Sequence, residues 1–136
     1  MKKHEDSIQR AVMTWARWQT LAPIGINGKL SHFIHHSPNG GYRSKSEGRN
    51  FKLLGTKAGF PDLFLFIPKG GYHGLFIELK TPKGKTKNGK TRQAGKVSDN
   101  QEMMIDRLNA VGYKAVVVYG ANEAIDEIKA YLGINK

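Results

Sequence analysis

The chain has 136 residues, of which 39% are hydrophobic and 24% charged, a length and composition typical of one soluble globular domain spanning residues 1–136. No apolar run is long enough to span a bilayer, and the lack of cysteine excludes thiol chemistry and fits a reducing compartment such as the cytoplasm. The net charge of +11 is uneven, with ten Lys and Arg against three Asp and Glu in residues 1–60, eight against two in residues 61–98, and four against six in residues 99–136. This distribution predicts a polyanionic partner, of which nucleic acid is the commonest.

The N-terminal part predicts one amphipathic helix followed by mostly irregular chain. Ile8, Val12 and Trp15 fall on one stripe, which predicts a helix over residues 5–20. Trp18 lies beside that stripe and is interpreted as a core or interface residue. The segments that follow favour a turn over residues 23–29, a short strand over residues 30–36, and a long functional loop or irregular hairpin over residues 37–59.

The central and C-terminal parts predict a sheet flanked by helices. Two apolar runs joined by a Gly-rich segment indicate a β-hairpin, and Ser98 supplies an N-cap for a helix that ends at Gly112. The remaining ranges are 63–67 and 75–79 for the hairpin strands, about 81–97 for a mobile basic loop, 115–119 for a buried strand and about 122–132 for a closing helix. The order α-β-β-β-α-β-α predicts the α/β class, a single-domain mixed β-sheet flanked by helices with one strand–helix–strand crossover.

The predicted hairpin brings two carboxylates and a lysine together. If the hairpin is symmetric about Gly71, Asp62 lies opposite Lys80 and Phe64 lies opposite Glu78. Side chains alternate along a strand, so Asp62, Glu78 and Lys80 then project from one face of the sheet. A register slip of one residue would separate the carboxylates, so this inference depends on the register.

Two carboxylates and a lysine on one face suit metal-assisted hydrolysis of a phosphodiester. Mg²⁺ prefers hard oxygen ligands and commonly takes one or two protein carboxylates, while a nearby ammonium group steers the attacking water or neutralises developing charge. The alternative from the residues alone is that Asp62 caps a turn and that Glu78 and Lys80 form an exposed charged pair.

Two further polar residues continue apolar stripes. Glu5 extends the stripe of the first helix toward the core, where a carboxylate needs a metal or a partner, although a glutamate near a helix start also favours the helix dipole. Gln101 continues the stripe of its own helix beside the strand that carries Glu78, although Ser98 and Gln101 also form a capping-box pattern. For each residue, the functional and the structural interpretation both stay open on these grounds.

Taken together, these motifs resemble the VRR-NUC domain, within the PD-(D/E)xK nuclease superfamily. The resemblance is carried by Gly59-Phe60-Pro61-Asp62-Leu63, Phe76-Ile77-Glu78-Leu79-Lys80, Ser98-x-x-Gln101 and Gly112-Tyr113. It covers nearly the whole chain and implies a restriction-endonuclease-like αβββαβ core. It also implies that Asp62, Glu78 and the main-chain carbonyl of Leu79 bind Mg²⁺, with Mn²⁺ expected to substitute. Lys80 would then be catalytic, with Glu5 and Gln101 completing the site; whether Glu5 contacts the metal or braces the site is left open.

Basic residues supply the predicted DNA contacts. Those assigned to DNA binding are Lys57, Lys83, Lys85, Lys87, Lys90, Arg92 and Lys96, and a second basic surface comprises Arg43, Lys45, Arg49, Lys52 and Lys57. The segment around Asn39, Arg43 and Arg49 does not match the family residue by residue. Histidine spacing does not fit a zinc site, so the histidines are not expected to bind metal.

These observations predict a Mg²⁺-dependent, structure-specific DNA endonuclease. By the resemblance, stand-alone domains of this type resemble Holliday-junction resolvases, act as homodimers and are often encoded by phages. The expected partners are therefore branched or duplex DNA and a second copy of the chain, with no membrane. The expected location is the cytoplasm, either as a phage protein in the host cell or in association with the nucleoid. The alternatives are a flap, nicking or restriction-like nuclease and a catalytically silent DNA-binding subunit. The two intact carboxylates argue against the silent subunit, because anions in a DNA cleft weaken phosphate binding unless a cation lies between them.

Overall fold

The computed structural model describes residues 2–38 and 45–134, and its centre is a mixed sheet. Within this part of the chain the strands run in the order β1-β2-β3-β6. Their bounds are Ile34–His36 for β1, Leu63–Leu65 for β2, Leu75–Lys80 for β3 and Lys114–Tyr119 for β6. The helices are α1 (Lys2–Arg17), α2 (Lys45–Leu53), α3 (Asp99–Ala110) and α4 (Ala121–Leu132), with short 3₁₀ segments at Ala22–Ile24 and Leu30–Phe33.

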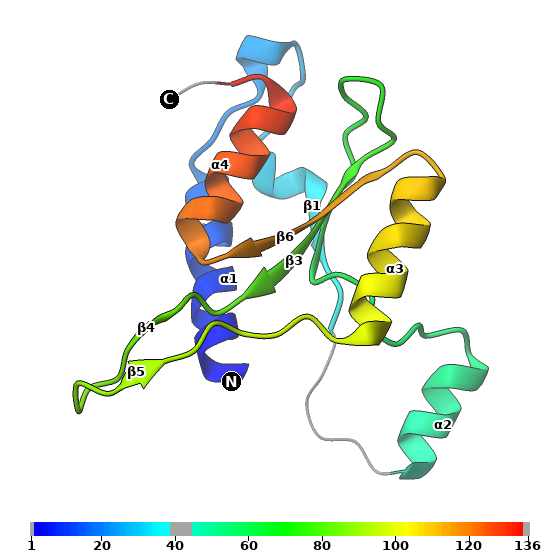
Figure 1. Cartoon of the computed structure of the whole chain (residues 1–136). Helices are drawn as coiled ribbons and strands as arrows, with labels where there is room; N and C mark the ends of the chain where they lie inside the picture. Colours follow the sequence, from blue (N-terminus) through cyan, green and yellow to red (C-terminus); the bar gives the residue numbers. More distant parts are fainter. Residues whose placement is uncertain (1, 39–44, 135–136) are drawn as a thin grey trace.

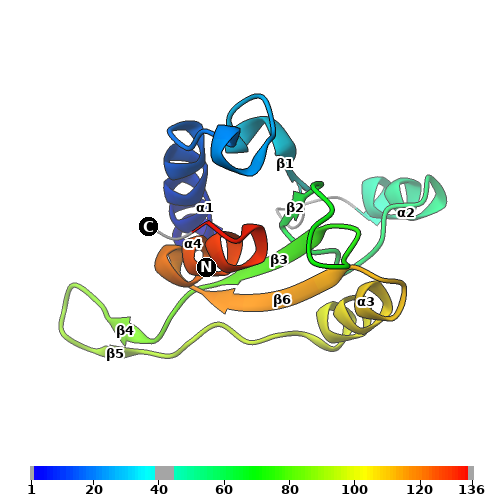
Figure 2. The ribbon, with the colours of Figure 1, turned by 90° about the horizontal axis from the view of Figure 1, so that it is seen from above.

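The sheet lies between helices on both faces. Figures 1 and 2 show α1 and α4 packed together on one face and α3 on the other. β2 is antiparallel to both of its neighbours, β1 and β3, whereas β3 and β6 are parallel and are joined through α3. This confirms the predicted α/β class, the mixed sheet and the single crossover.

β3 is the most deeply placed strand, and its two faces meet different cores. All six of its residues are buried. Leu75, Ile77 and Leu79 join the larger core, which holds residues of α1 and α4, while Phe76 joins a smaller core with Met104 and Leu108 of α3. Because side chains alternate along a strand, Glu78 and Lys80 lie on the α3 face, beyond the apolar part of the smaller core.

The register of the hairpin differs from the prediction. Phe64 pairs with Phe76, not with Glu78, so the predicted pairing of Asp62 with Lys80 is wrong by two residues. The turn closes on Lys69 and Tyr72, and the first limb has one more residue than the second between this bridge and the ladder. Since the displacement is an even number of residues, every side chain keeps its predicted face.

Three elements also differ from their predictions in bounds or in type. The first helix, predicted over residues 5–20, begins at Lys2 and ends at Arg17. The predicted strand over residues 30–36 begins only at Ile34, because Leu30–Phe33 forms a 3₁₀ turn in which the His32 ring accepts a hydrogen bond from the Lys29 amide at 3.2 Å. Part of the predicted loop over residues 37–59 is the helix α2. From Glu47 onward this helix is exposed, except for half-buried Gly48, so it lacks the buried apolar stripe that reveals a helix in a sequence.

The basic segment 81–97, predicted as a mobile loop, contains a two-stranded ribbon. β4 (Gly84–Lys85) pairs with β5 (Thr91–Arg92) in antiparallel register. The Gly95 amide donates to the Thr81 carbonyl oxygen at 2.9 Å and closes the base of this ribbon. Figure 2 shows the ribbon and α2 extending from opposite sides of the sheet. The predicted mobility of the segment stays a prediction.

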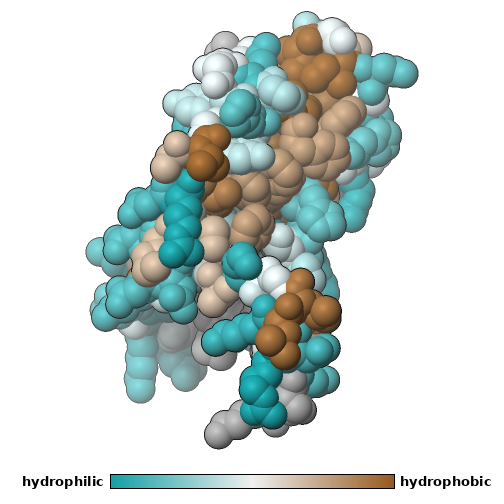
Figure 3. Space-filling model, turned by 90° about the vertical axis from the view of Figure 1, so that its right-hand side faces the viewer, coloured by the Kyte–Doolittle hydropathy of each residue, from teal (hydrophilic) through white to brown (hydrophobic). Residues whose placement is uncertain are grey.

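Apolar side chains remain on the surface at two helix ends. Trp18, just after α1, is 78% exposed, and Leu53 and Leu54, at the end of α2, are 86% and 74% exposed. Figure 3 shows an apolar band on the upper part of the face that carries α2 and α3, and a separate apolar cluster lower down where α2 lies. None of the helices in the described part of the chain has the length and apolarity needed to cross a membrane.

Candidate active site

Asp62 is held at the end of the sheet by its own strand and by β3. It follows the buried Pro61 and immediately precedes β2. Its Oδ2 accepts a hydrogen bond from the Leu79 amide at 2.7 Å. The amide and carbonyl of one strand residue point to the same side, so the Leu79 carbonyl is also directed to the side of β3 on which Asp62 lies.

Glu78 and Lys80 are buried ionisable residues of β3. Glu78 is 3% exposed and Lys80 is 6% exposed. The Lys80 Nζ lies 3.5 Å from Glu78 Oε2, which partly compensates the burial of both charges. The alternative interpretation of Glu78 and Lys80 as an exposed charged pair is therefore wrong, because β3 is covered on both faces.

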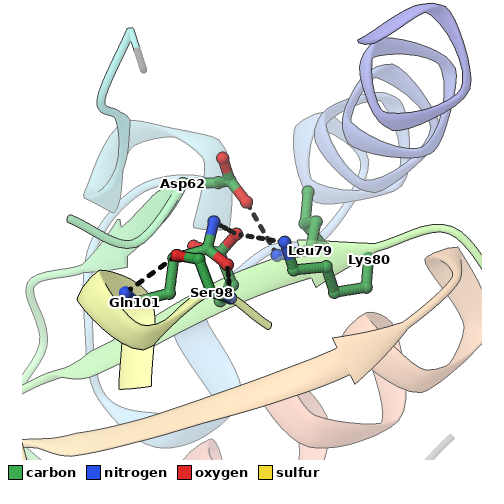
Figure 4. Close-up of polar contacts among 6 residues, drawn as sticks. Asp62, Leu79, Lys80, Ser98 and Gln101 are labelled. Carbon is green, nitrogen blue, oxygen red and sulfur yellow. Dashed lines mark hydrogen bonds and ion pairs between the residues drawn. The ribbon is translucent and has the colours of Figure 1, made fainter. Parts of the chain in front are cut away.

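Gln101 links the first turn of α3 to Glu78. Its Nε2 donates to Glu78 Oε2 at 2.9 Å, as Figure 4 shows. In the same turn Ser98 Oγ accepts from the Gln101 amide at 3.2 Å, and Gln101 Oε1 accepts from the Ser98 amide at 2.9 Å. The capping box and the contact with Glu78 are thus compatible, because the box uses Oε1 and leaves Nε2 free to donate.

Glu5, on α1, acts on the same carboxylate through its charge. It is half-buried, and its negative charge contributes to raising the pKa of Glu78. The structure therefore brings Glu5, Asp62, Glu78, Lys80 and Gln101 into one neighbourhood, although they come from four separate segments of the chain.

The electrostatics of the site favour a bound cation. Burial, and then the negative charge of Asp62, raise the pKa of Glu78 from 4.5 to about 8. Burial also raises the pKa of Asp62, while the Leu79 amide and then Lys80 oppose that rise. The charge of Asp62 thus disfavours ionisation of Glu78, and a cation between the two carboxylates would stabilise both in their charged forms.

The donor set fits a hard divalent cation. Asp62 and Glu78 offer carboxylate oxygens and Leu79 offers a carbonyl oxygen, which are the ligand types that Mg²⁺ prefers. Among residues 2–38 and 45–134, no group of three or more His, Cys, Asp or Glu side chains is arranged to hold a metal. A cation here would thus depend on two side chains, the main chain and water, which is usual for Mg²⁺.

A cleft of about 510 Å³ opens beside these carboxylates. Asp62, Glu78 and Gln101 line it on one side. The opposite wall comes from α2 and the chain that follows it, and it includes Arg49, Lys52 and Lys57. Lys57, one of the predicted DNA contacts, thus lies at the cleft, and its contact with DNA stays a prediction. The helix α2, which the sequence did not predict, contributes basic residues to the wall of the cleft.

The other predicted DNA contacts lie on or beside the ribbon. Lys83, Lys85, Lys87, Lys90 and Lys96 are exposed, and Arg92 is half-buried because its Nε donates to the Pro82 carbonyl oxygen at 3.3 Å. Asn39 and Arg43 lie outside the described residues, as does the side chain of Lys45.

One residue near the site was not predicted to belong there. His36 Nδ1 lies 3.3 Å from the Asp62 carbonyl oxygen, and its charge weakly lowers the pKa of Asp62. The only signal in the sequence was its position at the end of a predicted strand, which does not reveal the partner of that strand.

Comparisons with known proteins agree with this arrangement. The family model described as "VRR-NUC domain" matches residues 3–122. A solved structure described as "VRR_NUC domain protein" is 34% identical, with a TM-score of 0.74, and the match covers 98% of this chain and 91% of that one. A search of curated proteins finds no match.

Fold and site together have the pattern of a nuclease domain. The chain belongs to the VRR-NUC domain family.

Proposed function

We propose that this protein is a divalent-metal-dependent endonuclease that hydrolyses phosphodiester bonds in DNA. The observation that carries the proposal is the convergence on Glu78 of Gln101 at 2.9 Å and Lys80 at 3.5 Å, beside an Asp62 carboxylate bound to the Leu79 amide. Family membership supports a nuclease in general, and the arrangement supports the metal-dependent mechanism.

Each residue has a distinct role in this proposal. Mg²⁺, or Mn²⁺ in its place, held by Asp62, Glu78 and the Leu79 carbonyl would polarise the scissile phosphate and lower the pKa of a bound water. Gln101 and Lys80 both contact Oε2 of Glu78, which leaves Oε1 for the cation. The Lys80 ammonium group would also stabilise the negative charge that develops on the phosphate. Glu5 would brace the site from α1.

The position of the cations supports DNA as the substrate. Lys57, Arg49 and Lys52 line the cleft itself. The ribbon begins just after Lys80, the last residue of β3. Phosphates of a strand that enters the cleft would contact the cations that line it, and phosphates farther along the duplex would contact the cations of the ribbon.

We further propose branched DNA, and in particular a four-way junction, as the preferred substrate. Cations on two separate projections, α2 and the ribbon, favour a substrate with duplex on more than one side of the cleft (Figure 1). A junction is resolved by two symmetric nicks, and one chain carries one set of catalytic residues, so a twofold homodimer would supply the second. The exposed Trp18 is a candidate for that dimer surface.

The test compares cleavage of a synthetic four-way junction, a flap and a linear duplex of matched sequence. Each is incubated with Mg²⁺ or with chelator and with the native protein, Asp62→Asn, or the control Asp106→Asn, which removes an exposed carboxylate from α3. We expect paired nicks in the junction that require both Mg²⁺ and Asp62, and we expect the control to cleave as the native protein does.

Other outcomes separate the parts of the proposal. Metal-dependent cutting of flap or duplex as efficient as that of the junction would retain the chemistry and reject the substrate. In analytical ultracentrifugation, a particle of 15.2 kDa without DNA, together with one chain per DNA molecule in the complex, would reject the dimer. Tight binding without cleavage, equal in Mg²⁺ and chelator, would instead identify a catalytically silent DNA-binding subunit.

A further inference from the structure

Gly59 makes an unusually close approach to the first turn of α3. Its φ is +76°, and an ideal Cβ at this position would lie 2.5 Å from the Asn100 carbonyl carbon, 2.6 Å from the Asn100 oxygen and 2.6 Å from the Gln101 amide nitrogen. All three atoms belong to the main chain, so no side chain can rotate away to make room. Only glycine fits here without displacing one of the two segments.

The two segments in contact carry different parts of the candidate site. Gly59 lies three residues before Asp62, whose Oδ2 binds the Leu79 amide at 2.7 Å. The peptide that it touches leads into Gln101, whose Nε2 binds Glu78 at 2.9 Å. Gly59 also lines the same cleft as these residues. The separation of the Asp62 segment from the first turn of α3 is therefore set at Gly59.

We infer that Gly59 is a positioning residue that keeps the first turn of α3 close enough for Gln101 to hold Glu78 opposite Asp62. The inference rests on the proposed function, because it concerns the geometry of that catalytic site. A methyl group at position 59 would push α3 away from the Asp62 segment, lengthen the bond between Gln101 and Glu78, and loosen the carboxylate that binds the cation.

Backbone strain alone does not explain the requirement for glycine. Gly133 has nearly the same φ of +75°, but nothing lies within 4 Å of its ideal Cβ. It follows α4 at the C-terminal cap, away from the candidate site. Gly133→Ala therefore introduces the same left-handed strain without the close contact, and it is a matched control for Gly59→Ala.

The first experiment measures cleavage by the native protein, Gly59→Ala and Gly133→Ala over a range of DNA and Mg²⁺ concentrations. We expect kcat of Gly59→Ala to fall by about 100-fold, the scale associated with a small misplacement in an active site. The KM for DNA should change little, because the ribbon cations are untouched, and more Mg²⁺ should be needed for half-maximal rate. Gly133→Ala should keep the native kcat.

The second experiment combines Gly59→Ala with Gln101→Ala. If Gly59 acts through Gln101, the double variant cleaves no more slowly than the slower single variant, because the two substitutions disrupt the same contact. A purely structural role for Gly59 would instead make the two losses multiply. Multiplied losses, or native kcat in folded Gly59→Ala, would overturn the inference. A native protein that cleaves no DNA would refute the proposed function instead.

A measurement on the native protein decides the matter if Gly59→Ala does not fold. We expect a nuclear Overhauser effect between the α-protons of Gly59 and the amide proton of Gln101. During Mg²⁺ titration the Gly59 resonances should shift together with the side-chain amide of Gln101. Absence of the Overhauser effect, or a Gln101 shift with Gly59 unaffected, would overturn the inference.

Discussion

Glu78 is the residue on which the other members of the candidate site converge. Gln101 and Lys80 both contact its Oε2, and the charges of Asp62 and Glu5 act on its pKa. A carboxylate held this way has little freedom to rotate, so its remaining oxygen is oriented before a ligand arrives. The residue that supports this orientation without carrying a charge is Gln101.

Removal of the Gln101 side chain should therefore weaken metal binding while DNA binding persists. We expect Gln101→Ala to lose about 10- to 100-fold in Mg²⁺ affinity or in metal-dependent cleavage, the range found when a group that orients a metal ligand is removed. Gln19→Ala is the matched control, since Gln19 is also half-buried and donates to a carbonyl oxygen, that of Trp15 at 3.3 Å. Equal Mg²⁺ dependence in the two variants, measured by isothermal titration and cleavage, would contradict the role of Gln101.

The raised pKa of Glu78 predicts how stability depends on pH. In the folded protein the Glu78 carboxyl has a pKa of about 8 and stays protonated below it, whereas the ordinary pKa of a glutamate is 4.5. In the absence of metal, the free energy of unfolding should therefore decrease as pH rises between these values and level off above them. Glu78→Gln should remove most of this decrease. Urea denaturation at several pH values measures the free energy of unfolding. If its dependence on pH is the same in the native protein and in Glu78→Gln, the prediction is refuted.

The same proton links metal binding to pH. Mg²⁺ must displace it from the carboxylate pair, so the apparent Mg²⁺ affinity of the native protein should rise with pH up to about 8. Titrations in buffers of different ionisation enthalpy report the released proton directly.

The sequence was informative for residues that belong to a repeating pattern. Period-two alternation placed Asp62, Glu78 and Lys80 on one face even though the predicted register was wrong, because the error was two residues. The contact of Gly59 with Asn100 had no such pattern behind it. It joins segments far apart in the chain, and their distance depends on the packing of α3 against the sheet.

At the level of elements, the ribbon is the projection with the clearest expected effect on DNA binding. Lys85 and Lys87 are exposed on it. Replacing both with alanine should lower the slope of log affinity against log salt by about 1.8, if each neutralises one phosphate. The matched control replaces Lys29 and Lys69, which are also exposed but lie in the loop after α1 and in the turn before β3. An unchanged slope in the ribbon variant, or an equal change in the control, would exclude the ribbon from the DNA contact.

Elements were predictable where they bury an apolar stripe. α1, α3 and α4 do so and were predicted from spacing and caps, and the hairpin was predicted from its apolar runs. α2 and the ribbon face solvent along most of their length, so no buried pattern marks them. Exposed secondary structure of this kind depends on local propensity and tertiary contacts that a single sequence does not reveal.

At the scale of the whole molecule, the positive charge is sided rather than diffuse. The acidic residues of the last third lie on α3 and α4, while most cations of residues 61–98 lie on or beside the ribbon, which extends away from the end of β3 (Figure 1). Such a field steers an approaching polyanion, so the ribbon cations would attract DNA toward the side of the molecule that carries Lys80.

The two unequal cores of the molecule have a consequence for local opening. The larger core joins α1 and α4 to β3, whereas α3 rests on the smaller core through Phe76, Met104 and Leu108. Regions with fewer buried contacts open with a lower free energy than the molecule as a whole. A fluctuation that lifts the first turn of α3 therefore withdraws Gln101 from Glu78 while β3 and its carboxylate stay in place. The contact between Gln101 and Glu78 can therefore break and form again while the protein stays folded. The amides of α3 should exchange hydrogen faster than those of β3.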